Sequence, residues 1–428
     1  MVDKSNSPKW RVLAGGFLSY MFDAVDVIIL TIAMPDMMIG LHITRIQAGL
    51  LATATLLGIG LSGLLMGSLA DILGRKRALL LSLLSFGFLT MAISGISDWR
   101  LIFLLRFVSG LGLGGVYSAV AAHIAEVWPQ HQRGRATAFV LSSFSLGASL
   151  AAAISAYVLP MYGWQMLFFL CGASVIVPAS YVWLFVPESD DWLTRKNPSR
   201  VRIDESRRGK VADLFSRDLA RVTLLSTLIC SLALSAYWGT VTWLPTFLVR
   251  ERGLDVSTMA GFLALSHVGT FVGYNAFGLI SDRIGKKLAL MLSLFGVGLM
   301  LPIYALTTEK TVLLLLGPTY AFFVVFPGLA AAYLSEIFPT YIRATGAGFP
   351  FNVGRGISAV APLLLGMVAK TFGFGISISL CGMLYVLAAI VVQLLPRNGE
   401  SLCACAQVSA NDLLSTSSPK TDLRSPKI

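Results

Sequence analysis

The sequence predicts an all-α membrane protein with twelve transmembrane helices in two pseudo-symmetric bundles of six. Three observations support this fold class: an apolar composition, long apolar segments, and turn motifs that occur twice. Of the 428 residues, 56% are hydrophobic and 13% are charged, whereas about 25% of the residues in soluble domains are charged. The apolar segments have the length of helices and lack the short alternating pattern of a membrane barrel.

Hydropathy indicates twelve spans, each close to the ~20 apolar residues that a helix needs to cross a bilayer. Their expected positions are residues 10–35, 46–70, 77–97, 99–123, 135–159, 164–186, 221–249, 257–281, 288–307, 311–335, 343–369 and 373–395. A mixed-charge stretch after the sixth span divides them into two sets of six. We therefore expect an N-terminal bundle, a cytoplasmic connector, a C-terminal bundle and a disordered cytoplasmic tail, over residues 1–186, 187–220, 221–396 and 397–428.

The basic residues are distributed unevenly between alternate loops. Most of the 33 Lys and Arg residues lie in the head before the first span, the connector, the tail and the loops on that same side. The positive-inside rule places these segments and both termini in the cytoplasm, with the spans in the cell (inner or plasma) membrane. The net charge of +11 thus reflects topology and does not indicate nucleic-acid binding. The five cysteines show neither zinc-ligand spacing nor a disulfide framework, so no metal is expected.

Two turn motifs recur about 210 residues apart, a feature of transporters with duplicated halves. The turn after the second span reads Gly-Ser-Leu-Ala-Asp-Ile-Leu-Gly-Arg-Lys-Arg over residues 67–77, and its copy reads Gly-Leu-Ile-Ser-Asp-Arg-Ile-Gly-Lys-Lys over residues 278–287. A Glu, a Pro and an Arg recur likewise after the fourth and tenth spans. The positive-inside rule explains the basic residues of these turns but not the aspartates. We therefore expect a gate in which the aspartates cap helix N-termini or pair with an Arg of the other half. The alternative is that the charges only fix the membrane topology and do not move. The expected gating residues are Asp71, Gly74, Arg75, Asp282, Arg283, Gly285, Glu126, Arg133, Glu336 and Arg343.

The first span contains two acidic residues, Asp23 and Asp26, which share one face of a helix because they are three residues apart. Their mutual repulsion and their burial both favour the protonated form of at least one of them, which suits a proton carrier. Asp26 and Arg106 lie at similar depths, ~14 Å and ~12 Å below the outer surface at 1.5 Å per residue. We expect them to pair and Asp23 to carry the proton. The alternatives are that the acids serve only in ion pairs, and that Arg106 serves in packing or gating.

The eleventh span carries a basic residue, Arg355, near mid-bilayer, and the spans of the second half contain no acid to neutralise it. Its planar guanidinium suits a carboxylate, so we expect it to bind an anionic substrate in an aqueous cavity that Asp23 and Asp26 also face. The alternatives are that it caps backbone carbonyls or pairs with an acid of the first half. Further substrate-binding candidates, each of which could instead be a packing residue, are His267, Asn352, Asn275, Tyr237 and Tyr117.

The duplicated turn, with Arg106 and the Pro-Glu-Ser run over residues 187–189, resembles the major facilitator superfamily over nearly the whole chain. Within it, Asp-Ala-Val-Asp over residues 23–26 is similar to the Asp-Gly-x-Asp pattern of the proton-coupled aromatic-acid, organic-acid and sialic-acid symporters, with Ala24 in place of Gly. Trp128-Pro129 and the run over residues 348–355 are similar to the same branch. The resemblance implies the major facilitator fold, in which the first and fourth helices are neighbours that line the cavity.

Together these features predict a secondary active transporter that moves a small organic (carboxylic) acid with a proton by alternating access. The alternatives are a proton-coupled porter of a neutral or sugar-like solute, and a non-transporting membrane sensor with the same fold. No Walker-type ATP-binding motif is present, and we expect neither an enzyme nor a cofactor. The expected partners are a small organic anion, protons and the lipid bilayer, with no nucleic acid, and the protein is expected to act as a monomer.

Overall fold

The computed structural model describes residues 7–129, 133–189, 193, 211–339 and 342–396. Most of the predicted connector and the whole predicted tail therefore lie outside the described residues. The first half of the chain forms α1 (Ser7–Gly40), α2 (Arg45–Leu73), α3 (Arg75–Ile93), α4 (Trp99–Val127), α5 (Arg133–Ser174) and α6 (Ile176–Phe185). The second half forms the short η2 (Val211–Phe215), α8 (Ala220–Arg250), α9 (Val256–Ile284), α10 (Lys286–Leu306), α11 (Lys310–Phe322), α12 (Phe326–Ile337), α13 (Arg343–Ser358), α14 (Ala361–Phe372) and α15 (Phe374–Gln393).

Among the described residues, 11 helical segments are long and apolar enough to cross a membrane. One of them, Phe139–Phe185, has 47 residues, about twice the ~20 that one crossing needs. Its backbone leaves the helical conformation at Gly163, where φ is 75° and ψ is 177°. This break divides the segment into two spans, so the twelve predicted spans are present.

Two spans of the second half are interrupted within the membrane, and the corresponding spans of the first half are continuous. The tenth span breaks between α11 and α12, and the eleventh breaks between α13 and α14. Each break is followed by a proline in the first turn of the next helix, where the missing N–H removes no intrahelical hydrogen bond. Broken helices are tolerated at this depth where they line a cavity, because groups there can satisfy the freed backbone.

The two halves repeat each other in local backbone geometry. Gly74, between α2 and α3, has φ 101°, and Gly285, at the matching turn between α9 and α10, has φ 86°. Gly163 and Gly373, which precede the last span of each half, have φ 75° and 88°. Glycine adopts such positive φ angles without the steric cost that a side chain imposes. The sequence repeat is therefore matched by a structural repeat of the turns.

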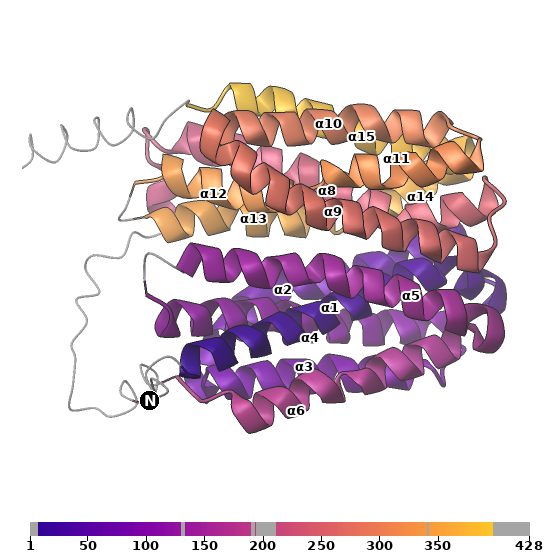
Figure 1. Cartoon of the computed structure of the whole chain (residues 1–428), viewed down its shortest axis with the longest axis horizontal. Coiled ribbons are helices and arrows are strands. Elements are labelled where there is room, and N and C mark those ends of the chain that lie inside the picture. The colour runs from indigo at the N-terminus through magenta and orange to yellow at the C-terminus, as the bar shows by residue number, and fades with distance from the viewer. Residues whose placement is uncertain (1–6, 130–132, 190–192, 194–210, 340–341, 397–428) are drawn as a thin grey trace, which may run out of the picture.

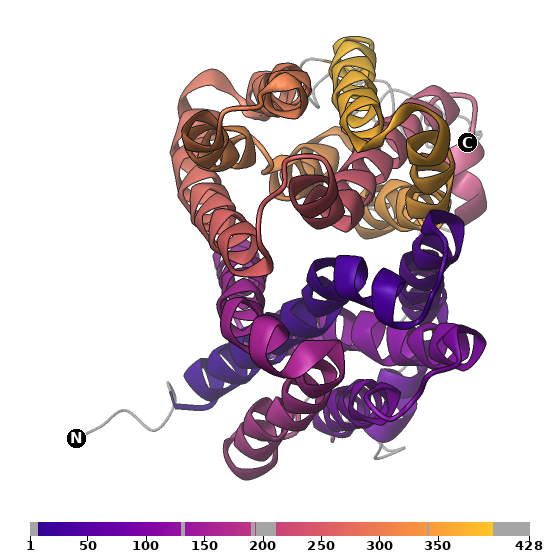
Figure 2. The ribbon, with the colours of Figure 1, turned by 90° about the vertical axis from the view of Figure 1, so that its right-hand side faces the viewer.

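The helices of the two halves form two groups that lie side by side with their long axes roughly parallel (Figure 1). Viewed along the helices, the helices of each group are bundled together, and the two groups meet along one interface (Figure 2). We call the end of the molecule with the turns at Gly74 and Gly285 the Gly74 end, and the opposite end, where α1 ends, the Pro35 end.

The halves are joined most closely towards the Pro35 end. Arg45 donates to the carbonyl oxygen of Ala369 at 2.6 Å, and Arg250 donates to that of Pro35 at 3.5 Å. A side chain at Gly49 would meet the backbone of Pro362 at 2.9 Å, which shows how closely α2 approaches α14. These contacts close the interface at this end.

Candidate functional site

A cavity of about 400 Å³ lies between the two halves. Helices α1, α4 and α5 of the first half contribute to its wall, and the second half supplies most of the lining residues. The wall extends from Pro245, towards the Pro35 end, to Ser335, towards the Gly74 end. Tyrosine, tryptophan and phenylalanine side chains form much of the surface, so the cavity combines apolar faces with scattered hydroxyl groups.

Arg355 is the only permanently charged residue among the described residues that line the cavity, and none of them is Asp or Glu. It lies in the last turn of α13, where the helix dipole favours a positive charge. Its guanidinium carbon lies 5.3 Å from the ring centre of Phe351, and its buried Nε has no hydrogen-bond partner among the described residues. The sequence-based prediction that Arg355 lines an aqueous cavity agrees with this position.

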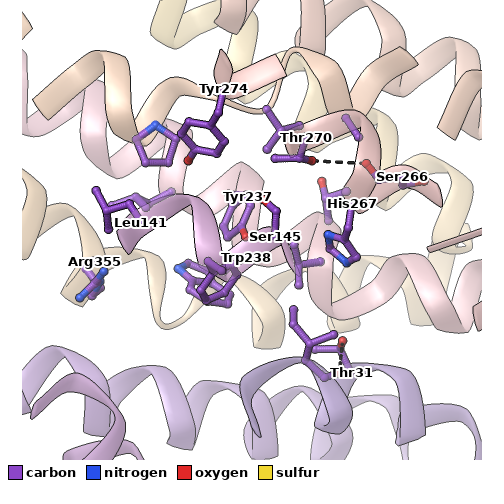
Figure 3. A pocket seen from close by; sticks show the side chains of 18 of the residues that line it. Thr31, Leu141, Ser145, Tyr237, Trp238, Ser266, His267, Thr270, Tyr274 and Arg355 are labelled. Atoms are coloured by element: carbon purple, nitrogen blue, oxygen red, sulfur yellow. Dashed lines mark hydrogen bonds between the residues drawn. The ribbon is translucent and has the colours of Figure 1, made fainter. Parts of the chain in front are cut away.

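His267, from α9, lines the cavity on the other side of the Tyr237 and Trp238 rings from Arg355 (Figure 3). Those two rings are in edge-to-face contact, with centroids 5.0 Å apart. Tyr117 also lines the cavity, as does Asn352. A ligand could therefore place a carboxylate at Arg355 and a polar group at His267, with its middle part against the aromatic rings between them.

Asn275, another predicted substrate-binding residue, is exposed and does not line the cavity. Its amide nitrogen donates to the carbonyl oxygen of Phe271 at 2.9 Å, a bond within α9. Trp243 is fully buried, and its indole nitrogen donates to the carbonyl oxygen of Pro362 at 2.8 Å. Trp243 therefore packs inside the second half, whereas Trp238 belongs to the cavity wall.

Asp26 and Arg106 form a buried ion pair. Arg106 Nη1 lies 2.7 Å from Asp26 Oδ1, and the side chains are 0% and 2% exposed. The guanidinium carbon also lies 4.7 Å from the ring centre of Phe168, a cation–π contact within the first half. The pairing expected from their matching depths is thus present, and neither residue lines the cavity.

Asp23 is 6% exposed and likewise does not line the cavity. The expectation that both acids of the first span face the cavity is therefore wrong for Asp26, which is turned towards Arg106; for Asp23 it stays a prediction. Oδ1 of Asp23 is buried and has no hydrogen-bond partner among the described residues. Arg355 is nevertheless close enough to interact electrostatically with Asp23 across the interface.

The gating candidates form ion pairs inside each half, close to the Gly74 end. Arg75 binds Glu126 at 2.8 Å, and Lys286 forms the matching pair with Glu336 in the second half. The Arg75 pair is more deeply buried than the Lys286 pair, whose side chains are 32% and 52% exposed. Both pairs tie the third span of a half to its fourth, and so they stabilise each half as a unit.

The other gating candidates whose side chains are described form no ion pair across the halves within the described part of the chain. Asp282 is exposed, and so is Arg283; in the described part of the chain neither has an ion pair. Nε of Arg133 donates to the carbonyl oxygen of Trp128 at 2.9 Å, a local bond. The side chains of Asp71 and Arg343 lie outside the described residues. The role of these residues as gates thus stays a prediction.

Several polar lining residues were not identified from the sequence. The clearest are tyrosines of apolar spans that line the cavity: Tyr20, Tyr274, Tyr320 and Tyr385. Hydroxyls of Ser and Thr, such as Thr31 and Thr270, appear in the wall as well (Figure 3). A tyrosine inside an apolar helix is the only signal the sequence offers, and it applies equally to tyrosines that pack in the core.

Known proteins agree with this architecture. The family model described as the Major Facilitator Superfamily matches residues 16–361. The chain belongs to this superfamily and is a multi-pass membrane transporter.

The chain is similar to the cis,cis-muconate transport protein of Acinetobacter baylyi, with 26% identity over 393 residues, 91% of this chain and 94% of that protein. It is also 26% identical over 378 residues to a sialic acid transporter of Escherichia coli, covering 87% of this chain and 90% of that protein. The crystal structure of a D-xylose–proton symporter has a TM-score of 0.76 and 17% identity, covering 91% of this chain and 99% of that one. The last match shows a shared fold.

Proposed function

We propose that the protein is a secondary active transporter that carries a small organic acid together with a proton. The observation that carries this proposal is Arg355: among the described residues, its guanidinium has no ion-pair partner, and the cavity that it lines has no Asp or Glu. Arg355 is half-buried, and a bound carboxylate can form charge-assisted, two-pronged hydrogen bonds with its guanidinium.

The lining favours an acid with one carboxylate and a flat, unsaturated body. A second carboxylate would have no permanently charged partner, because Arg355 is the only such residue among the described lining residues. The rings of Tyr237, Trp238 and Phe351 offer faces for a planar group. The names of the muconate and sialic acid relatives support an organic acid as the class of substrate.

Asp23 is the proposed proton carrier. In the proposed cycle, Asp23 is ionised while the cavity is empty, and the nearby guanidinium of Arg355 balances its charge. A bound carboxylate cancels the charge of Arg355, after which protonation of Asp23 leaves the loaded centre neutral. The carrier changes conformation at lower cost when its centre has no net charge, either loaded with acid and proton or empty with Asp23 and Arg355 both ionised. A centre with a single uncompensated charge changes conformation at higher cost, and this difference couples acid transport to proton transport.

Alternating access follows from the closed interface at the Pro35 end. The distribution of the basic residues supports a cytoplasmic location for the Gly74 end, and we infer that this conformation faces the cytoplasm. Transport then requires the contacts of Arg45 with Ala369 and of Arg250 with Pro35 to break as the bundles, proposed to be 1–186 and 221–396, rock about the cavity. One chain contains the whole cavity, which supports a functional monomer.

The experiment is uptake of radiolabelled benzoate, a planar monocarboxylate, into liposomes that contain the purified protein. An inwardly directed proton gradient should drive accumulation faster than in protein-free liposomes, which take up the permeant neutral acid slowly, and a protonophore should abolish it. Arg355→Gln should remove accumulation, whereas Arg100→Gln, an exposed arginine in the first turn of α4, should leave it intact. Accumulation of xylose that survives Arg355→Gln would indicate the neutral-solute porter, and no flux of benzoate, muconate, N-acetylneuraminate or xylose would indicate the sensor.

A further inference from the structure

His267 lines the cavity with hydrogen-bonding groups that the described protein does not use. It lies on α9 and is half-buried, and its imidazole forms no hydrogen bond or ion pair with any described residue. Both ring nitrogens keep accessible surface. A neutral imidazole has one donor nitrogen and one acceptor nitrogen, so the ring can bind a polar group of a molecule in the cavity.

The hydroxyl residues next to His267 on α9 differ from it in this respect. The cavity-lining residues of this helix recur every three or four positions over residues 263–274, so they share one helix face. On that face, Ser266 Oγ donates to the carbonyl oxygen of Phe262 at 2.8 Å, and Thr270 Oγ1 donates to that of Ser266 at 3.5 Å (Figure 3). Their hydroxyl hydrogens are used inside the helix, whereas the imidazole between them is available to a ligand.

Aromatic surface separates His267 from Arg355 within the cavity. The rings of Tyr237 and Trp238, in edge-to-face contact, lie between the two residues (Figure 3). A rigid acid whose carboxylate binds Arg355 and whose body lies along these rings therefore directs its far end towards His267. Hydrogen bonds are stronger in such a poorly hydrated place, and a polar group buried there without a partner is costly. The far end of the ligand is thus where the cavity can discriminate between acids.

We propose that His267 is a specificity-determining residue, which binds a hydroxyl group at the end of the substrate opposite its carboxylate. A hydroxyl group both donates and accepts, so it pairs with the imidazole whichever ring nitrogen carries the hydrogen. The class of substrate narrows accordingly to rigid hydroxy acids with the carboxylate at one end and the hydroxyl at the other. This inference rests on the proposed function, in which Arg355 binds the carboxylate.

The test is calorimetric titration of the purified full-length protein with two pairs of acids, benzoate with 4-hydroxybenzoate and cinnamate with 4-hydroxycinnamate. The second pair places the hydroxyl further from the carboxylate. In at least one pair, the hydroxyl should tighten binding to the unaltered protein by about fivefold, the ratio expected for one hydrogen bond. His267→Phe, which keeps a flat ring without nitrogen atoms, should abolish this ratio and leave the affinities for benzoate and cinnamate unchanged. His267→Gln, which restores a donor and an acceptor, should retain the preference.

Asn275→Leu is the matched control, because Asn275 lies on the same helix, does not line the cavity and uses its amide nitrogen within α9. This variant should bind all four acids as the unaltered protein does. Equal affinities within both pairs, a ratio that persists in His267→Phe, or a ratio lost equally in His267→Gln would overturn the inference alone. A loss of benzoate binding in His267→Phe would assign His267 a packing role and overturn it too. If the unaltered protein bound none of the four acids, or if Arg355→Gln bound them equally well, the proposed function would fall together with the inference.

Discussion

The two halves share their turns and differ in the membrane interior. Both have positive-φ glycines at matching turns, and both have an ion pair between their third and fourth spans. In the first half, the buried Arg106 is neutralised by Asp26 at 2.7 Å. In the second half, Arg355 has no ion-pair partner among the described residues and lines the cavity. The duplicated framework thus holds one arginine that completes a packed core and one that is available to a ligand.

The difference follows from continuity of the helices. Arg106 lies in the continuous α4, surrounded by packed neighbours, and its charge must be met inside the protein. Arg355 lies in the last turn of α13, beside a break in the eleventh span. The negative end of the helix dipole stabilises its positive charge there, even though no carboxylate is paired with it. The broken helix thus places Arg355 at a helix terminus beside the cavity, whereas the continuous α4 holds Arg106 in a packed interior.

The largest expected effect concerns the paired arginine. Arg106→Met should lower the free energy of unfolding by ~3–5 kcal/mol, because it leaves Asp26 buried without its partner. Arg106→Met combined with Asp26→Leu should recover most of that loss, because no charge then remains. Denaturant unfolding in detergent micelles measures both. A double variant as unstable as the single one would show that the pair is not the cause.

Arg355→Gln should weaken ligand binding and leave stability intact, in contrast to Arg106→Met. It should weaken benzoate binding by about 30-fold or more, corresponding to the ~2–5 kcal/mol lost when one partner of a buried charge pair is truncated. The free energy of unfolding should not fall, because the guanidinium has no ion-pair partner in the described part of the protein. Calorimetric titration and unfolding of the same samples give both values, with Arg100→Gln as the control. A loss of stability as large as that of Arg106→Met would remove the distinction between the two arginines.

The close contact at the Pro35 end offers a conformational test. A Cβ at Gly49 would lie 2.9 Å from the carbonyl oxygen of Pro362, whereas one at Gly261 would meet nothing within 4 Å. Overpacking costs ~1–3 kcal/mol, so Gly49→Ala should shift the protein towards a state that is open at the Pro35 end. A cysteine at Thr31 should then react about tenfold faster with an impermeant maleimide from that side. Equal rates in Gly49→Ala and Gly261→Ala would show that this contact does not close the interface.

The smallest effects concern matching helix caps of the two halves. Thr44 and Gln47 form reciprocal hydrogen bonds at the start of α2, and Asp255 accepts from the Thr258 backbone at the start of α9. Thr44→Ala and Asp255→Ala should each lower the free energy of unfolding by about 1 kcal/mol. Similar losses in both variants would extend the symmetry to the caps, and a loss confined to one variant would limit it to the turns.

The two caps should differ only in their response to pH. Hydrogen bonds from Thr258 hold the pKa of Asp255 below its usual value. A depressed pKa stabilises the folded state above the unfolded pKa, and this contribution is lost as the pH falls through the folded pKa. The cost of Asp255→Ala should therefore shrink in acid, whereas that of Thr44→Ala should stay constant. Unfolding measured at neutral and acidic pH compares them.

The fold could be predicted because its signals are local. Span length, the charge of alternate loops and the repeated turn at Gly74 and Gly285 each follow from a short stretch of chain. The pair of Asp26 with Arg106 could be anticipated as well, because equal depth and opposite charge restrict the partners available inside a membrane. These features need no knowledge of how the two halves meet.

The cavity wall could not be predicted to the same extent, since it depends on side-chain direction at the interface of the halves. Asn275 and Asn352 are equivalent as sequence signals, but only Asn352 lines the cavity. Tyr20, which lines the cavity, could not be distinguished from core tyrosines, and the pair of Asp26 with Arg106 corrects the view that both acids face the cavity. The breaks after α11 and α13, which create much of the wall, depend on packing across several helices.

The central claim is that a carboxylate bound at Arg355 draws a proton onto Asp23. Titration of benzoate into the purified protein, repeated in buffers of different ionisation enthalpy, measures the protons taken up on binding. We expect uptake of about one proton per benzoate by the unaltered protein and none by Asp23→Asn. Binding without proton uptake, or uptake that persists in Asp23→Asn, would contradict the account.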